Sequence, residues 1–549
     1  MSLSIRAPFS VDPVVNFVLV LAMTFGASAT ASEQAPGDEL SFSNAVDVTV
    51  VDLAVSVLDQ QGLPVTGLGR QAFTVFEDGK QMQLTHFREV NQQGKPVEPE
   101  LSEDPATLPG GWVAVAVDLS AIHMTNAKRV FRGAEGFLRA AAARGDRIMV
   151  ATVYPEESIV LPFSSDIDAV LAALSSVQKS NRSGTVTSKS NRMLRLDIKN
   201  ARARDIDRER IRNQLTLLRV QESARVRTIL GNAGDLFVDL AGLPGRTDVL
   251  WIGENLSLFP AHDEYRMWWE RFCQVIDSLP GCDPPELWSF DADLRRPFQQ
   301  LAATAHAAGT VIHVIDGGDP DRGLFGADSG GPVGLSSQGG SELITDGIQG
   351  GMYLASATGG SFHGNSRNVT PWFEKLESVT GQWYSIGYTL DRPPDGKIHS
   401  VQVRVAADDV IVRHPEKVWY GPAQDQLLAS VRTRLAVNGG SNELGITASP
   451  EQGGSTLRVR VTIPLKALFT IDGKAQVTCV VAVDVGDEGL PTIISRRLEL
   501  TAPAADAPPN TLATAVMETG LPPTLNAVVG ILDEISGAMS TVGLIPIPR

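Results

Sequence analysis

Ser329 lies in the sequence GADSGGPVG (residues 326–334), whose pattern is typical of a segment that presents a nucleophilic serine. Such a serine needs a histidine and an aspartate that the fold brings next to it. The nearest upstream histidines, His306 and His313, fall on a predicted helix and a predicted strand of an α/β sheet, and no β-barrels are predicted to assemble the three groups. We therefore expect a glycine-rich surface loop here. A secreted hydrolase that acts through Ser329, or through Glu254, is the alternative.

The remaining polar residues show no catalytic pattern. Asp316, Asp319 and Asp321 lie close together in DGGDPDRG, but they lack the spacing and the closing glutamate of an EF-hand. A solvated loop is therefore favoured over a Ca²⁺ site. The eight histidines form no H-E-x-x-H pair, and the sequence contains no Walker loop and no dinucleotide fingerprint. We expect no catalytic residue and no enzymatic activity.

Two adjacent tryptophans, Trp268 and Trp269, lie in the sequence YRMWWERF (residues 265–272). Neighbouring residues on a helix cannot both face one core stripe. Either one tryptophan packs inward while the surrounding insertion covers the other, or an exposed tryptophan anchors a partner, since Trp is enriched at interface hot spots. The sequence leaves both possibilities open.

The chain has three cysteines, too few for a disulfide scaffold or for a four-cysteine zinc site. Cys273 and Cys282 flank a predicted turn at Pro280 and Gly281. In an oxidising compartment these two cysteines can close a short disulfide loop, and the alternative is a pair of unlinked thiols in a surface insertion. Cys479 lies in a strand pattern, and we expect it to be a small buried side chain.

The N-terminus has the pattern of a signal peptide. Arg6 precedes an apolar run over residues 14–23, small residues follow, and we expect cleavage after Ala29 or Ala31. The run is shorter than the roughly 20 residues that a membrane-spanning helix needs, and no other segment is apolar enough. We therefore expect residues 1–31 to be a signal peptide and the mature chain to be exported, to the periplasm or the cell exterior, without a transmembrane span.

Composition excludes some classes of protein. The chain has 47 Lys and Arg against 63 Asp and Glu, a formal net charge of −16 and a pI near 5.0. Nucleic-acid binding is not expected, because neutralising phosphates requires clustered Lys and Arg. A hydrophobic share of 43% with 20% charged residues is ordinary for globular proteins. The length of 549 residues allows about three to five domains.

The spacing of hydrophobic residues changes along the first part of the chain. Residues 45–90 alternate in the two-residue period of half-buried strands, and residues 91–110 are polar and contain proline, as in a linker. In residues 111–392, continuous apolar strands alternate with amphipathic helices. This alternation predicts a doubly wound, mostly parallel α/β sheet with helices on both faces, carrying an insertion near residues 255–290.

The last strand predicted for this α/β sheet is WYSIGYTL (residues 383–390). Strands return over residues 398–421, and residues 425–549 read as short strands with Gly/Pro turns, which predicts a C-terminal β-sandwich. The strands on either side of the α/β region are too few to form stable sheets separately. We therefore expect them to pair into one small β-domain that has the α/β domain inserted in it.

Two phrases of the chain carry a resemblance to a known family. The phrase QQGLPVTGLGRQAFTVFEDGKQMQLTHF resembles the segment that precedes the A domain in secreted proteins related to von Willebrand factor A, which are common in Acidobacteria. The phrase LASATGGSFHGNSRNVTPWFEKLESVTGQWYSIGYTL is similar to the closing half of that domain. The resemblance covers about Val46 to Tyr420, and it implies an A-type α/β fold.

The resemblance also implies a metal-ion-dependent adhesion site at the C-terminal edge of the sheet. The family uses an Asp-x-Ser-x-Ser segment, a loop threonine and a later aspartate. Here Ile122 stands at the second serine and has no lone pair to offer a metal. The positions that match in this chain are Asp118, Ser120, Thr185 or Thr187, and Glu254. Such a degenerate site either binds Mg²⁺, Mn²⁺ or Ca²⁺ weakly, or is a relic in which Asp118 and Ser120 cap a helix.

These expectations combine into one function. We expect an exported, non-enzymatic protein that binds a protein or a surface glycan through the top face of its α/β sheet. The alternatives are the serine-type hydrolase at Ser329 and a purely structural scaffold in the cell envelope.

Overall fold

The computed structural model describes most of the chain from Val50 to Leu544, and the predicted signal peptide and most of the predicted linker fall outside the described residues. The described residues are 50–91, 111–118, 120, 124–180, 193–202, 204–243, 246–273, 282–285, 293–318, 346–364, 368–390, 392, 395, 397–419, 421–437, 439–440, 442–451, 456–471, 473–484, 491–501, 511–522 and 526–544.

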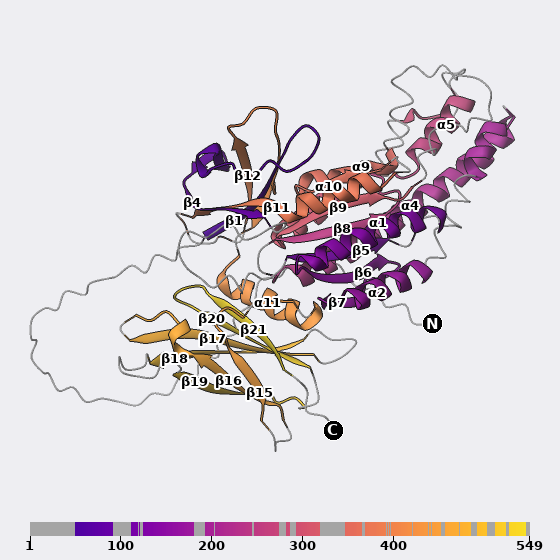
Figure 1. The fold of residues 1–549 in the computed structure, drawn as a ribbon. Coiled ribbons are helices and arrows are strands. Elements are labelled where there is room, and N and C mark those ends of the chain that lie inside the picture. Colours follow the sequence, from indigo (N-terminus) through magenta and orange to yellow (C-terminus); the bar gives the residue numbers. More distant parts are fainter. Residues whose placement is uncertain are drawn as a thin grey trace, which may run out of the picture. The chain divides into compact units, whose positions relative to one another are not determined.

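A six-stranded sheet in the order β10-β9-β8-β5-β6-β7 forms the centre of the α/β region (Figure 1). Its strands are β5 (Trp112–Asp118), β6 (Arg147–Tyr154), β7 (Ser158–Ser164), β8 (Thr247–Gly253), β9 (Thr310–Asp316) and β10 (Phe362–His363). All neighbours are parallel except β7, which runs antiparallel to β6. Every residue of β5, β8 and β9 is buried, as expected for continuous apolar strands covered on both faces.

Helices cover both faces of this sheet. They are α1 (Met124–Ala143), α2 (Ile167–Ser180), α4 (Asp205–Leu240), α7 (Arg295–Ala307), α9 (Gln349–Ala357) and α10 (Thr370–Gly381), while α5 (His262–Phe272) packs on the N-terminal half of α4. One core joins the sheet to α4, α7 and α9, and a second core joins the opposite face to α1, α2 and α10. The region is therefore a mixed α/β domain with a parallel-rich sheet. Among the described residues, no helix is both long and apolar enough to cross a membrane.

Two four-stranded antiparallel sheets form the small β-domain, in the orders β13-β1-β11-β4 and β14-β12-β2-β3. Their strands are β1 (Val50–Leu58), β2 (Phe73–Glu77), β3 (Lys80–Met82), β4 (Leu84–Asn91), β11 (Gln382–Thr389), β12 (Ile398–Val405), β13 (Ile411–Arg413) and β14 (Lys417–Trp419). β1 pairs with β13 and β2 pairs with β12. The expected backbone pairing between the strands before and after the α/β region is therefore confirmed.

The placement of WYSIGYTL in the α/β sheet was wrong. β11 pairs with β1 and β4 in the antiparallel sheet and has no partner in the six-stranded sheet. The physical reason lies in alternate residues: Tyr384, Ile386 and Tyr388 are each at most 2% exposed and pack into the core of the β-domain. A run of aromatic and β-branched residues suits either kind of sheet, so its composition does not choose between them.

The C-terminal part begins with a helix that the all-strand expectation for residues 425–549 missed. Helix α11 (Ala423–Val437) packs Leu427 and Val431 against Val480 and Val528. The two sheets that follow have the orders β15-β16-β19 and β18-β17-β20-β21 and share one apolar core. Their strands are β15 (Thr447–Pro450), β16 (Arg458–Pro464), β17 (Lys474–Val483), β18 (Thr492–Thr501), β19 (Leu512–Glu518), β20 (Ala527–Asp533) and β21 (Met539–Leu544).

Candidate functional site at the C-terminal edge of the sheet

Three acidic residues and one serine lie where the parallel strands end. Asp118 is the last residue of β5 and Asp316 is the last residue of β9, while Glu254 directly follows β8. All three are less than 9% exposed, and Ser120 is 2% exposed. The carboxyl ends of adjacent parallel strands meet at one edge, where open α/β sheets usually bind ligands. The sequence-predicted Asp118, Ser120 and Glu254 therefore belong to the same edge.

Arg225 of helix α4 reaches into this edge. Its Nη1 donates hydrogen bonds to Ser120 Oγ at 2.7 Å and to Asp118 Oδ2 at 3.4 Å. Its Nη2 donates to the backbone oxygen of Asn255 at 2.6 Å. The Arg225 side chain is only 7% exposed. One guanidinium thus joins the end of β5 to the segment that follows β8.

Neighbouring residues fix the orientation of this arginine. Glu222, one turn earlier on α4, accepts from Arg225 Nε at 2.9 Å. Asn255 has a backbone φ of 60°, in the left-handed region, and its N–H donates to Asp316 Oδ2 at 3.0 Å. Asn is among the non-glycine residues that tolerate this conformation best. The segment after β8 is therefore held from one side by Arg225 and from the other by Asp316.

The electrostatics of the site reflect its burial. Burial raises the pKa of Asp118, and the nearby charge of Arg225 and the hydrogen bonds from Ser120 offset that rise only in part. Burial works to lower the pKa of Arg225, but Glu222 and Asp118 outweigh it, so the pKa of Arg225 is raised. Arg225 therefore stays charged, and its positive charge stabilises the buried carboxylates around it.

The described residues of this arrangement do not fit a divalent metal ion. Ser120 Oγ accepts a hydrogen bond from Arg225 and itself donates to Asp118 Oδ1 at 2.5 Å. The oxygen atoms of Asp118 and Ser120, which the family resemblance assigns to a metal, are thus bonded to a guanidinium and to each other. A small ion with strict octahedral geometry would have to displace this guanidinium, which is only 7% exposed and is also bonded to Glu222 and to the backbone of Asn255. The predicted ligands Thr185 and Thr187, and Ile122 at the position of the missing serine, lie outside the described residues.

The two tryptophans of the insertion lie in a small core of their own. Trp268 is fully buried, its Nε1 donates to the backbone oxygen of Arg208 at 3.1 Å, and its ring packs between Tyr265 and Phe272. Trp269 is half-buried against the same cluster. Trp268 is therefore a core residue and not an exposed anchor, because Ile211 and Leu215 of α4 belong to the same buried cluster.

A disulfide joins Cys273 and Cys282, with a Cα–Cα distance of 5.6 Å. It connects the residue after α5 to a short segment in which the backbone oxygen of Asp283 accepts a hydrogen bond from the Tyr265 hydroxyl at 2.8 Å. Cys479 is fully buried, and burial raises its pKa to about 12. Its thiol is therefore unreactive at neutral pH.

Ser361, His313 and Asp248 have the hydrogen-bond order of a serine, a base and an orienting acid. Ser361 Oγ lies 3.0 Å from His313 Nδ1, and His313 Nε2 lies 3.0 Å from Asp248 Oδ1. However, Arg246 pairs with Asp248, and the backbone N–H of Ser361 also donates to His313 Nδ1. Burial lowers the pKa of His313, which is 1% exposed. We interpret this group as a buried structural network. Ser329 lies outside the described residues.

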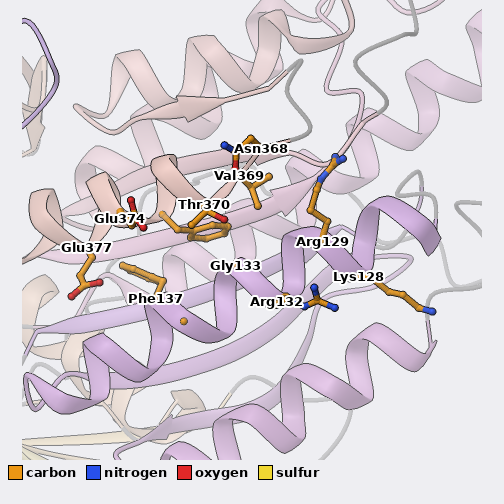
Figure 2. Close-up of a pocket in the computed structure, with 12 residues that line it drawn as sticks. Lys128, Arg129, Arg132, Gly133, Phe137, Asn368, Val369, Thr370, Glu374 and Glu377 are labelled. Carbon is orange, nitrogen blue, oxygen red and sulfur yellow. The ribbon is translucent and has the colours of Figure 1, made fainter.

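A groove of about 590 Å³ lies between helices α1 and α10 (Figure 2). Phe137 and Phe373 form its apolar part. The charged side chains along it are basic toward the start of α1 and acidic further along α10: Lys128, Arg129 and Arg132 against Glu374 and Glu377. Its volume is in the range of small-ligand sites.

Comparisons with known proteins give no family assignment. No family model matches the chain, and no curated protein matches it. Among solved structures, it is similar to an aerotolerance-related membrane protein from Bacteroides fragilis and to the conserved hypothetical protein BatB from Bacteroides thetaiotaomicron. Each similarity has 12% sequence identity and a TM-score of 0.23, and covers 49% of this chain and 98% of the other.

Proposed function

We propose that this chain is an exported, non-enzymatic interaction protein of the von Willebrand factor A-like type. Its partner, a protein or a surface glycan, binds at the C-terminal edge of the parallel-rich sheet. The observation that supports this proposal best is Arg225, which contacts Ser120, Asp118 and Asn255 at that edge. We propose that its guanidinium takes the place that a divalent metal ion has in related sites.

A guanidinium can organise this edge as a metal ion would. It carries a permanent charge and presents its donors in a fixed plane, so it holds several oxygens in one geometry. The Arg225 side chain has little contact with solvent, since it is 7% exposed. It therefore acts on a partner through the segments it positions, in particular the segment around Asn255. Binding through such a surface does not depend on divalent ions.

The first prediction is that partner capture does not need a metal ion. The full-length mature chain is immobilised and exposed to native envelope extract with and without EDTA, and captured material is quantified. We expect equal capture in both conditions. Arg225→Met should reduce capture at least about tenfold, because it releases the segment after β8, while the exposed neighbour Arg227→Met should leave capture unchanged. Loss of capture in EDTA that Mg²⁺ or Mn²⁺ restores and Zn²⁺ does not would contradict the proposal.

The hydrolase alternative has a direct test. A fluorophosphonate probe reacts with activated serines, so labelling that is lost in Ser329→Ala or Ser361→Ala would establish a serine hydrolase instead of an interaction protein. We expect no labelling of either serine. A purely structural scaffold would show no saturable capture in the first experiment.

A further inference from the structure

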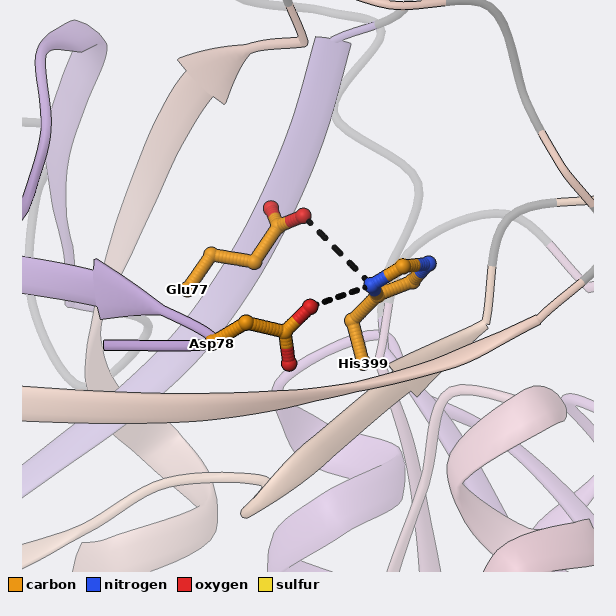
Figure 3. A group of neighbouring side chains, drawn as sticks. All are labelled: Glu77, Asp78 and His399. Carbon is orange, nitrogen blue, oxygen red and sulfur yellow. Dashed lines mark hydrogen bonds and ion pairs between the residues drawn. The ribbon is translucent and has the colours of Figure 1, made fainter. Parts of the chain in front are cut away.

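A second cluster of metal-ligating side chains lies in the small β-domain (Figure 3). Glu77 ends β2, Asp78 follows it in the hairpin turn, and His399 lies on the adjacent strand β12. One ligating atom from each residue lies within 4.8 Å of the other two. His399 Nδ1 is 2.7 Å from Asp78 Oδ2 and 3.8 Å from Glu77 Oε1. Both carboxylates thus converge on one ring nitrogen.

The other ring nitrogen of His399 has the partner that metal-binding histidines usually have. His399 Nε2 lies 3.0 Å from Asp395 Oδ1. A carboxylate on the far nitrogen fixes the ring orientation and raises the basicity of the ligating nitrogen. The contact between Asp395 and Nε2 is a second observation, separate from the convergence of Glu77 and Asp78 on Nδ1. It presents Nδ1 toward the two carboxylates as the ligand atom.

The charges of the cluster match a divalent cation. Three carboxylates, from Glu77, Asp78 and Asp395, are accompanied by the guanidinium of Arg392. With His399 neutral, these groups carry a net charge of −2. A divalent ion would neutralise that charge, and a mixed set of one imidazole and two carboxylates suits zinc.

We propose that Glu77, Asp78 and His399 form a Zn²⁺ site, with water as the fourth ligand and Asp395 orienting the histidine. Zinc binds carboxylate oxygen and imidazole nitrogen at about 2.0–2.2 Å in tetrahedral geometry, so ligand atoms lie about 3.3 Å apart. The distances of 2.7 Å and 3.8 Å around His399 Nδ1 bracket that value. Binding replaces the proton shared by His399 and Asp78, and that proton leaves to solvent.

Arg392 competes with the metal ion for this position. Its Nη2 lies 2.5 Å from Glu77 Oε1 and 3.1 Å from His399 Nδ1. The Arg392 side chain is 32% exposed, so it can turn toward solvent when the ion enters. The cluster therefore has two states, one in which Arg392 contacts the ligand atoms and one in which zinc binds them. Removing the arginine should favour zinc.

The experiment is a calorimetric titration of the full mature chain, freed of metal, with ZnCl₂ at neutral pH. We expect one saturable site that releases protons, as shown by heats that vary with the ionisation enthalpy of the buffer. Asp395→Asn should weaken zinc binding about 10–100-fold, as for other groups that orient a ligating histidine. Arg392→Ala should tighten binding at least about tenfold, because it removes the competing cation.

His399→Gln should abolish the site, while His86→Gln, at an exposed position on β4, should leave it unchanged. Circular dichroism verifies that each variant is folded. If His399→Gln unfolds, Arg392→Ala still tests the site, because it is expected to gain affinity for zinc. No saturable zinc binding to the unaltered chain would overturn the proposal, as would binding that persists in folded His399→Gln. Either result would leave the cluster as a protonated ion network only.

Discussion

Arg225 lies among the carboxylates of Asp118, Glu222 and Glu254, which all act on its charge. A buried ion pair adds little to stability compared with apolar residues, but removing one partner leaves the other charge buried and uncompensated. At this edge the acidic partners outnumber the arginine. The loss of its charge should therefore leave several buried carboxylates without a compensating cation.

Arg225→Met should lower the free energy of unfolding by about 3–5 kcal/mol, because it leaves Asp118 and Glu222 buried without a cation. Urea denaturation of the folded chain measures this change. The matched variant Arg227→Met, at an exposed position of the same helix, should stay within about 0.5 kcal/mol of the parent. Equal stability of the two variants would contradict the role given to Arg225.

His399 should make stability depend on pH. Burial and the repulsion from Arg392 work to lower the pKa of His399. The hydrogen bonds to Asp78 and Asp395 outweigh them, so the pKa is raised. Glu77 also faces the ring. A folded-state pKa above the unfolded value means that the stabilisation is complete below about pH 6.5. It is lost as pH rises through the folded-state pKa.

With EDTA present, His399→Gln should therefore lower the Tm more at about pH 5 than at about pH 9. Thermal unfolding followed by circular dichroism at both pH values measures the difference. His86→Gln is the control and should show no such dependence. An equal loss of Tm at both pH values would show that the charge of His399 contributes nothing.

The sequence predicted part of the site and missed its central residue. Asp118 and Glu254 were predicted from the family resemblance, and the structure places both at the carboxyl ends of buried parallel strands, which share one edge of a sheet. Arg225 could not be predicted, because it is 107 residues from Asp118 in a long charged helix with many arginines. Nothing in the spacing of that helix distinguishes the arginine that turns inward. Only the packing of α4 on the sheet identifies it.

At the scale of elements, helices α1 and α10 approach closely because of one glycine. A Cβ atom at Gly133 would lie 2.3 Å from Phe373 Cε2 and 3.3 Å from Val369 Cγ2. Gly136, one turn further along α1, has no neighbour within 4 Å of such an atom. Substitutions at the two glycines therefore separate the effect of packing on stability from the effect of helix propensity.

Gly133→Ala should destabilise the chain by about 1–3 kcal/mol, because the added methyl group displaces Phe373 from the contact between the helices. Gly136→Ala should instead stabilise it by up to about 1 kcal/mol, since Ala is the better helix former. Urea denaturation of the two variants measures both changes. Stabilisation by both substitutions would show that α1 and α10 do not pack as described.

The elements themselves were predicted with uneven success. Strands β5, β8 and β9 were predicted because their unbroken apolar runs match burial on both faces. Strand β11 was assigned to the wrong sheet, since its sequence does not reveal which strands pair with it. Helix α11 was missed because its apolar residues, Leu427 and Val431 among them, form only a narrow stripe within a region of strands.

At the scale of the whole molecule, the small β-domain is built from both sides of the α/β region. The register places Val401 opposite Glu77 and Val57 opposite Val412, so strands more than 300 residues apart share backbone hydrogen bonds. The same domain carries the proposed zinc site, while Arg225 belongs to the α/β sheet. The two sites can therefore be tested separately in one chain.

A manganese titration tests whether Arg225 replaces a metal ion at the edge of the parallel-rich sheet. The titration uses the full chain with His399→Gln, so that the cluster in the β-domain does not contribute. We predict that Mn²⁺ gives the same heats whether Asp118 is intact or replaced by Asn, because Arg225 already contacts Asp118 and Ser120. Saturable Mn²⁺ binding that Asp118→Asn abolishes, in a chain that retains Arg225, would contradict the account.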